Sequence, residues 1–333
     1  MKAPRWLVAA SPHLPGRDST PVIMWSVVGS LVPIVAAGIY YFGPSAVLVL
    51  LAATLGALIP ERLWGHRGSL GDGSAVITGI LLALTLPPGF PLWMAFVGGF
   101  FGIALGKVVF GGLGQNPFNP ALLGRAFLQA AFPVAITTWP QSGGNWWNLR
   151  GDNFAWPLMS PDTSDIVTEA TPLGLMKFEK TSTAFGDLLV GSTGGCIGET
   201  AGLLILICGG YLALRNYLNW RIPVSIFATV AALAALVYLF DDTKPTPWFM
   251  LFSGGLMLGA VYMATDMVTS PVTNKGCWVF GIGIGVLVVA IRYWGGLPEG
   301  VMYAILLMNM LVPFINRATQ PKVFGTGRVR SAS

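Results

Sequence analysis

The chain has 333 residues, of which 54% are hydrophobic and only 10% are charged. Soluble domains carry roughly 25% charged residues, so a surface of this composition could not be kept in water. With a mean hydropathy of +0.67, the composition excludes soluble hydrolases, nucleic-acid-binding proteins and disordered chains, and it favours a polytopic membrane protein.

Apolar runs of the length of membrane helices recur along the whole chain. We expect ten spans, at 22–42, 45–60, 74–88, 92–110, 121–138, 195–214, 223–240, 248–264, 277–293 and 299–315. Several are short or interrupted by Gly and Pro, which is tolerated where neighbouring protein satisfies the freed backbone groups. The sequence therefore predicts an all-α membrane protein of about ten transmembrane helices, some of them broken.

The basic residues give this arrangement an orientation. The N-terminal segment contains Lys2, Arg5 and Arg17 but no apolar run before Val22, so we expect no cleaved signal peptide. If this segment is cytoplasmic and the ten spans alternate, most of the 19 Lys and Arg, Lys107 and Arg125 among them, fall on the cytoplasmic side. The positive-inside rule then places both termini in the cytoplasm.

One long polar excursion, 139–194, falls on the opposite side and is predicted to be an extracytoplasmic loop. Loops of this length in compact proteins are usually functional. The excursion divides the chain into a five-helix half at 1–138 and another at 195–333. A weak internal repeat supports a duplication: the polar runs 114–121 and 264–274 each follow a glycine-rich span.

Histidine and cysteine exclude two cofactor classes. The two histidines, His13 and His66, lie in polar segments, which excludes a membrane haem held by paired histidines. The three cysteines have no C-x-x-C spacing, so this chain alone could not hold a four-cysteine iron–sulfur cluster. We interpret them as small buried hydrophobes, and a pair between Cys196 and Cys277 is the alternative.

Within the loop, Thr171 lies in a Thr-Glu-Ala-Thr-Pro-Leu run at 168–173. Pro172 biases Thr171 toward an extended conformation, and the surrounding Ser, Thr and Asp residues are typical of turns. A plain turn is therefore one interpretation of this segment, and an exposed hydroxyl available for modification is the other.

Asn116 and Asn119 lie in an Asn-Pro-Phe-Asn-Pro run between two apolar spans. This run cannot be continuous helix, because each proline lacks a donor and disfavours helix before it. We expect a broken or re-entrant element that lines a cavity or packs on protein. The two amides could bind the edge of a flavin or serve as structural caps.

Three acidic residues lie in or beside apolar spans: Asp72, Glu199 and Asp266. A charge at the bilayer centre costs about 2.5–3.5 kcal/mol on insertion scales, so we treat all three as candidates for an ion pathway. Helix capping or turn formation near the surface is the alternative for Asp72 and Asp266. Ion coordination, proton relay and hydrogen bonding to a flavin are not separated by the sequence.

Several motifs together resemble one family, which includes the D subunit of the Rnf complex, an ion-translocating ferredoxin:NAD oxidoreductase of bacterial membranes. The B subunit of the sodium-pumping NADH:quinone reductase is similar. The resemblance covers essentially the whole chain and is carried by the residues at 11–13, 72–75, 114–121, 168–173, 198–200 and 263–266.

This resemblance implies a chemistry. A threonine at the position of Thr171 carries covalent FMN through a phosphoester in that family, although here Glu169 stands where the motif often has glycine. A second, non-covalent flavin similar to riboflavin is implied, with Asn116 and Asn119 as its best candidates, and no metal site is expected.

The implied function is that of a membrane subunit of a redox-driven pump for Na⁺ or H⁺ in the bacterial inner membrane, not catalytic alone. Its partners would be the other flavin and iron–sulfur subunits, a flavin transferase and the lipid bilayer. The alternatives are a B-type subunit of the quinone reductase, or a non-redox channel or transporter built on broken-helix repeats.

Overall fold

The computed structural model describes residues 18–65, 68–140, 145–157, 169–181, 183–191, 194–199 and 202–321. These residues form helices and contain no β-strand, which confirms the all-α class for the described part of the chain. Thr168, Thr200, His66 and the motif at 11–13 lie outside the described residues.

The first half begins with two long helices, α1 (Thr20–Phe42) and α2 (Pro44–Trp64), joined through the single residue Gly43. Gly43 has a φ of 67°, and a Cβ there would overlap the carbonyl oxygen of Trp146. Only glycine accepts both conditions. The remaining elements of this half are η1 (Ser69–Asp72), α3 (Ser74–Leu84), α4 (Leu92–Ile103), η2 (Ala104–Val108), α5 (Pro120–Ala131) and α6 (Pro133–Ile136).

The predicted outer loop contains short elements, and the second half contains seven further segments. The former are α7 (Pro172–Gly174) with η3 (Leu175–Glu179), and α8 (Phe185–Val190). They are followed by α9 (Gly202–Leu214), α10 (Arg221–Phe240), α11 (Pro247–Phe252), α12 (Leu256–Leu258), η4 (Gly259–Met263), α13 (Asn274–Trp294) and α14 (Val301–Thr319).

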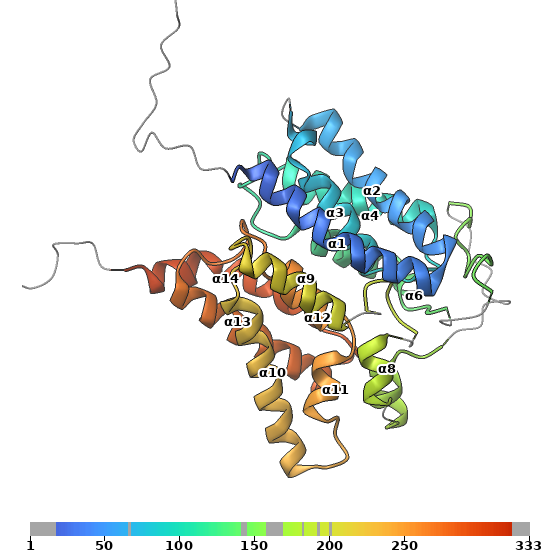
Figure 1. Ribbon diagram of the computed structural model, residues 1–333, viewed down its shortest axis with the longest axis vertical. Coiled ribbons are helices and arrows are strands. Elements are labelled where there is room, and N and C mark those ends of the chain that lie inside the picture. Colours follow the sequence, from blue (N-terminus) through green and yellow to red (C-terminus); the bar gives the residue numbers. More distant parts are fainter. Residues whose placement is uncertain are drawn as a thin grey trace, which may run out of the picture.

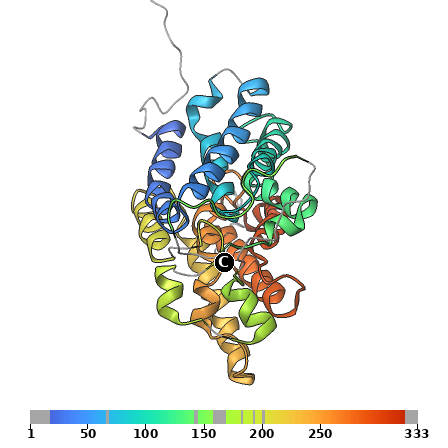
Figure 2. The same cartoon turned by 90° about the vertical axis from the view of Figure 1, so that its right-hand side faces the viewer.

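The helices form two groups that follow the chain order. In one group α2 packs against α3 and α4, and α4 packs against α5; in the other, α10 packs against α11 and α13, and α13 against α14. The blue and cyan helices of the first group lie beside the yellow to red helices of the second in Figure 1, and the turned view in Figure 2 shows the same division. Contacts of α1 with α9 and of α5 with α14 join the groups.

Every expected span contains helix, but the lengths differ. Within the described residues five helices, α1, α2, α10, α13 and α14, are long and apolar enough to cross a membrane, and three shorter apolar helices lie at Ser74–Leu84, Leu92–Val108 and Gly202–Leu214. The chain is therefore a polytopic membrane protein by length and composition, and the count of ten spans stays a prediction. In the sixth span the described residues 194–199 form bends and turns and the helix α9 is described from Gly202, while the eighth span is interrupted after Phe252.

Where spans are interrupted, backbone hydrogen bonds join neighbouring segments, and buried arginines donate to the carbonyls at the helix ends. The segment before α9 pairs with the chain that follows α3: Ile197 N donates to Leu86 O at 3.2 Å, and Gly198 N donates to Leu84 O at 2.7 Å. Free carbonyls at helix ends need donors. Arg125 supplies one to Thr85 O, and Arg292 supplies two, to Met250 O and Ser253 O.

The three cysteines are free and buried, as expected for small hydrophobes. The alternative, a pair between Cys196 and Cys277, does not form. Each thiol instead donates to a backbone carbonyl, Cys196 to Thr85 O at 3.0 Å and Cys277 to Pro271 O at 3.2 Å.

Candidate functional site

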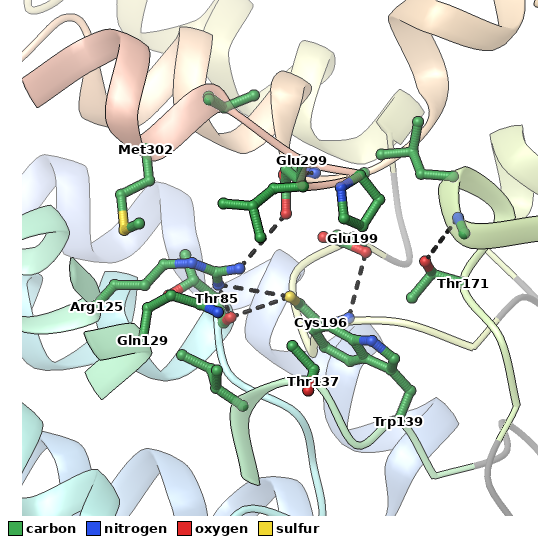
Figure 3. Close-up of a pocket in the computed structure, with 18 of the residues that line it drawn as sticks. Thr85, Arg125, Gln129, Thr137, Trp139, Thr171, Cys196, Glu199, Glu299 and Met302 are labelled. Atoms are coloured by element: carbon green, nitrogen blue, oxygen red, sulfur yellow. Dashed lines mark hydrogen bonds and ion pairs between the residues drawn. The ribbon is translucent and has the colours of Figure 1, made fainter. Parts of the chain in front are cut away.

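A cavity of about 740 Å³ lies where the two groups of helices and the predicted outer loop meet. Its wall is formed by the end of α3, one side of α5, the segment 136–139, the Thr171 segment and the residues before α9. The α11–α12 break with the elements that follow it and the loop before α14 with the start of α14 complete it. Ligand sites in proteins usually measure 300–1,000 Å³. Figure 3 shows the polar side chains of this wall converging on one another.

Thr171 lines this cavity and begins a helical turn. It is the N-cap of α7, with φ −63° and ψ 151°, and its Oγ1 accepts a hydrogen bond from Gly174 N at 3.2 Å. The turn interpretation of this segment is therefore right for its local geometry. The cavity adds a second property, because the Thr171 hydroxyl is half-buried in the wall of a space large enough for a cofactor.

Lys177 attaches the Thr171 segment to the loop before α14. Its Nζ donates to Gly295 O at 2.5 Å and to Leu297 O at 2.7 Å. Partial burial lowers the pKa of Lys177 below its usual value, since burial disfavours the charged form. The two hydrogen bonds hold together two stretches of the cavity wall that are distant in sequence.

Arg125 lies at the centre of the wall. It is 9% exposed and donates to Thr85 O, to Cys196 Sγ at 3.6 Å and to Glu299 Oε2 at 3.4 Å. The positive-inside count places Arg125 on the cytoplasmic side, which stays a prediction, and the structure adds that the side chain is buried and paired inside the protein. A guanidinium suits this position since its fork offers five donors in fixed geometry.

Two carboxylates share this part of the cavity, Glu199 and Glu299. Glu199 Oε2 accepts from Cys196 N at 3.3 Å, and Glu299 Oε1 accepts from Gly255 N at 2.6 Å. Glu199 is one of the predicted ion-pathway candidates, and the structure brings it into the same cavity as Thr171. Sequence reasoning missed Glu299, although it is the first residue of the expected span 299–315 and an acid at the margin of an apolar span is the pattern that could have found it.

Asn116, Asn119 and Asp266 meet around a second and much smaller cavity of about 90 Å³. Asn119 caps α5, accepting from Ala121 N at 3.0 Å and donating to Met263 O at 3.1 Å. Asn116 donates to Phe118 O at 3.2 Å, while its Oδ1 is buried with no hydrogen-bond partner among the described residues. Asp266 accepts from Val268 N and Thr269 Oγ1 within its own turn.

Asp72 belongs to a buried ionic cluster beside this second cavity. Its Oδ1 accepts from Ser74 N and Oγ in front of α3, and its Oδ2 lies 3.8 Å from Lys107 Nζ. Lys107 is 2% exposed and pairs with Glu61 at 2.8 Å. The positive-inside count also includes Lys107 on the cytoplasmic side, and the structure shows that this side chain too is buried and paired. A lysine inside an apolar span is the pattern that could have found this pair.

The chain matches the family model described as the NQR2, RnfD, RnfE family over residues 7–325. It belongs to this family.

Several relatives are similar in sequence to this chain over nearly their whole length. The chain is 40% identical to the D subunit of the proton-translocating ferredoxin:NAD(+) oxidoreductase complex of Clostridium ljungdahlii, covering 96% of each chain. It is 39% identical to the Na(+)-translocating counterpart of Acetobacterium woodii, covering 97% of this chain and 96% of the relative. The D subunit of the ion-translocating oxidoreductase complex of Stutzerimonas stutzeri is 40% identical, with 93% of each chain covered.

The residues of the larger cavity fit a flavin. Trp139, Phe178 and Tyr303 offer aromatic surface, and Gln129 and Thr137 offer side-chain donors and acceptors. The smaller cavity differs in this respect, because its 90 Å³ is well below the size of usual ligand sites. A second flavin at Asn116 and Asn119 thus stays a prediction, and its binding requires that the surrounding helices move apart.

Proposed function

We propose that this chain is the subunit of a redox-driven ion pump that carries covalent FMN on Thr171 and passes electrons between partner subunits. Membership of the NQR2, RnfD, RnfE family and relatives named as D subunits make it a membrane subunit of an ion-translocating ferredoxin:NAD⁺ oxidoreductase complex. The chain is not catalytic alone, since partner subunits deliver and remove the electrons.

The observation that carries the FMN proposal is the position of Thr171 in the wall of the 740 Å³ cavity. The cavity has room for a flavin, and the hydroxyl is at the start of a helical turn that Pro172 holds in place. The quinone-reductase alternative belongs to the same family, but the Clostridium, Acetobacterium and Stutzerimonas relatives are named as D subunits of ferredoxin:NAD(+) or ion-translocating oxidoreductase complexes. We therefore favour the ferredoxin:NAD⁺ complex.

Bound FMN would supply the transfer of electrons one or two at a time, and the chain's own side chains would do the rest. Thr171 would hold the phosphate end. Lys177 keeps the attachment segment on the loop before α14, and Trp139 and Tyr303 line the cavity with aromatic rings that exclude water. Arg125 places a fixed positive charge in a wall that also contains carboxylates.

The membrane arrangement belongs to the same proposal. Ten spans, cytoplasmic termini and an outward-facing 139–194 loop would place Thr171 on the extracytoplasmic side of a bacterial inner membrane. There a flavin transferase could reach it before assembly with the iron–sulfur and flavin subunits. Asp72, Glu199 and Asp266 are the acids proposed for the path of Na⁺ or H⁺, and a riboflavin between the helices is the second proposed cofactor.

Intact mass tests the attachment site. The full chain is expressed in bacterial membranes with its flavin transferase, beside Thr171→Val, and we expect the mass of one FMN ester on the wild type only. Thr171→Ser, which keeps the hydroxyl, should restore part of the modification. An excess that persists in Thr171→Val would move the site, with Thr168 next, and no excess or flavin absorbance in any chain would favour the transporter alternative.

A further inference from the structure

The carboxylates of Glu199 and Glu299 approach the same backbone position, the break between α11 and α12. A Cβ built on Gly255 would lie 2.6 Å from Glu299 Oε1 and 3.7 Å from Glu199 Oε1. Gly255 N already donates to Glu299 Oε1 at 2.6 Å. The two side chains come from segments that are distant in sequence and meet in a wall that Figure 3 shows crowded with polar groups.

Of these two carboxylates, Glu299 is paired with a cation and Glu199 is not, among the described residues. Arg125 Nη2 lies 3.4 Å from Glu299 Oε2. Arg292 is the other guanidinium close to the α11–α12 break, and it donates to the carbonyls of Met250 and Ser253. Among the ion pairs of the described residues Glu199 has none, and the group that binds its Oε2 is the neutral Cys196 N–H.

Acidic side chains also outnumber basic ones in the cavity wall as a whole. The cavity is lined by four carboxylates and one guanidinium; the carboxylates are Glu169, Glu179, Glu199 and Glu299. Cys196 and Tyr303 are the other titratable groups of the lining, and Lys177 is held by two carbonyls outside it. Neighbouring carboxylates in a poorly solvated site do not both ionise, because each charge disfavours the other.

We infer that Glu199 is a proton-binding site of this cavity, which holds its proton in a large fraction of the molecules at neutral pH, while Glu299 is the carboxylate that pairs with Arg125. The proton comes from water and binds to one carboxylate oxygen of Glu199, giving the carboxylic acid; its release regenerates the carboxylate. Arg125 pairs with Glu299, which leaves Glu199 as the carboxylate of the two that takes up the proton.

A proton fits this site better than Na⁺. Hard cations need several oxygen ligands, and the described residues contain no group of three or more His, Cys, Asp and Glu side chains suited to a metal ion. Three carbonyls at the surrounding helix ends, those of Thr85, Met250 and Ser253, already accept from arginines. A bound cation would also have Arg125 as a neighbour of like charge.

If the cavity holds the proposed flavin, a proton on Glu199 offsets the negative charge of electrons on that flavin. Negative charge that arrives in the cavity with electrons favours proton uptake at Glu199, and its departure favours release. This consequence rests on the proposed function, whereas the protonation of Glu199 in the chain without flavin does not.

Infrared spectroscopy of the full chain, purified without its flavin transferase, tests the protonation directly. We expect the stretch of a protonated carboxyl, shifted by D₂O, in the wild type at neutral pH. It should be lost in Glu199→Gln and kept in Glu179→Gln, whose side chain is exposed at the edge of the same cavity. In Glu299→Gln it should also be lost, because Arg125 then stabilises the ionised form of Glu199.

Two results would overturn the inference: no protonated carboxyl in the folded wild type at neutral pH, or an unchanged band in Glu199→Gln. Helical circular dichroism checks the fold, and Glu299→Gln keeps the test decisive if Glu199→Gln does not fold. In the flavin-loaded chain, Glu199→Gln should weaken the pH dependence of the flavin midpoint potential. Intact mass on the same samples reports flavin attachment separately, so failure of one proposal does not imply failure of the other.

Discussion

Arg125 on α5 and Glu299 before α14 form an ion pair across 174 positions of sequence, with Nη2 and Oε2 3.4 Å apart. The pair joins the two groups of helices at the wall of the large cavity, and the side chains are 11% and 23% exposed. Arg125 also supplies the donor for Thr85 O, where α3 has ended. The Arg125 guanidinium thus donates to a free carbonyl at the end of α3 and pairs with a carboxylate, and in this way it connects the two halves of the chain.

Replacement of Arg125 by Met should destabilise the protein strongly. It removes the guanidinium donor from Thr85 O and from Glu299 Oε2, and loss of one partner of a buried pair costs about 3–5 kcal/mol. Partial exposure of Glu299 places the expected value near the lower end. Thermal unfolding in detergent measures the loss, and Arg317→Met, at an exposed position of α14, should change the midpoint little. Equal midpoints for the two variants would contradict the connecting role.

The Lys107–Glu61 pair should show strong coupling in a double-mutant cycle. Lys107→Met alone leaves a buried carboxylate, one oxygen of which already has no partner among the described residues, so we expect a loss of about 3–5 kcal/mol. The double variant Lys107→Met with Glu61→Leu should be more stable than Lys107→Met alone, since no unpaired charge remains. Additive losses in denaturant unfolding would show that the two side chains do not interact.

The elements are largely predictable from sequence because apolar runs are local. α1, α2, α10, α13 and α14 follow the expected spans within a few residues at most ends. The start of α9 is not predictable in this way, because residues 194–199 form bends and turns in which Ile197 N and Gly198 N donate to Leu86 O and Leu84 O, and these bonds are tertiary contacts. For that reason the expected sixth span begins several residues too early.

The site is predictable only where a motif marks it. Thr171 and Glu199 stand out by resemblance and by charge in an apolar context, yet their common cavity is a product of folding. Arg125 and Lys107 resemble surface charges in the sequence, because a basic residue near the end of a span has the same appearance whether it faces water or a buried acid. Only the distances to Glu299 and Glu61 separate these cases.

Gly99 on α4 should tolerate no side chain. A Cβ there would overlap the carbonyl oxygen of Ala53 on α2, and small residues let helices in membranes approach this closely. Gly99→Ala should therefore cost about 1–3 kcal/mol through overpacking. Gly29→Ala on α1 is the matched control, because nothing lies within 4 Å of its Cβ position, and helix propensity predicts a gain of about 0.5–1 kcal/mol. Unfolding midpoints that shift in the same direction would refute the close packing of α2 on α4.

Lys177 should contribute more to stability as the pH rises. Partial burial lowers its pKa, whereas the unfolded chain keeps the usual value of about 10.4. Just below that value the unfolded state therefore binds more protons than the folded state, and stability increases with pH. The neutral amine still has hydrogens for Gly295 O and Leu297 O.

The difference in unfolding midpoint between wild type and Lys177→Met is thus expected to grow from about pH 8 to about pH 10. Lys180→Met, at an exposed neighbouring position, controls for general charge effects and should show no such trend. Hydrogen exchange should report the same change locally, with faster exchange at 172–179 and 295–300 in Lys177→Met. A midpoint difference that shrinks with pH would mean that the ammonium form, and not the hydrogen bonds alone, holds the Thr171 segment to the loop before α14.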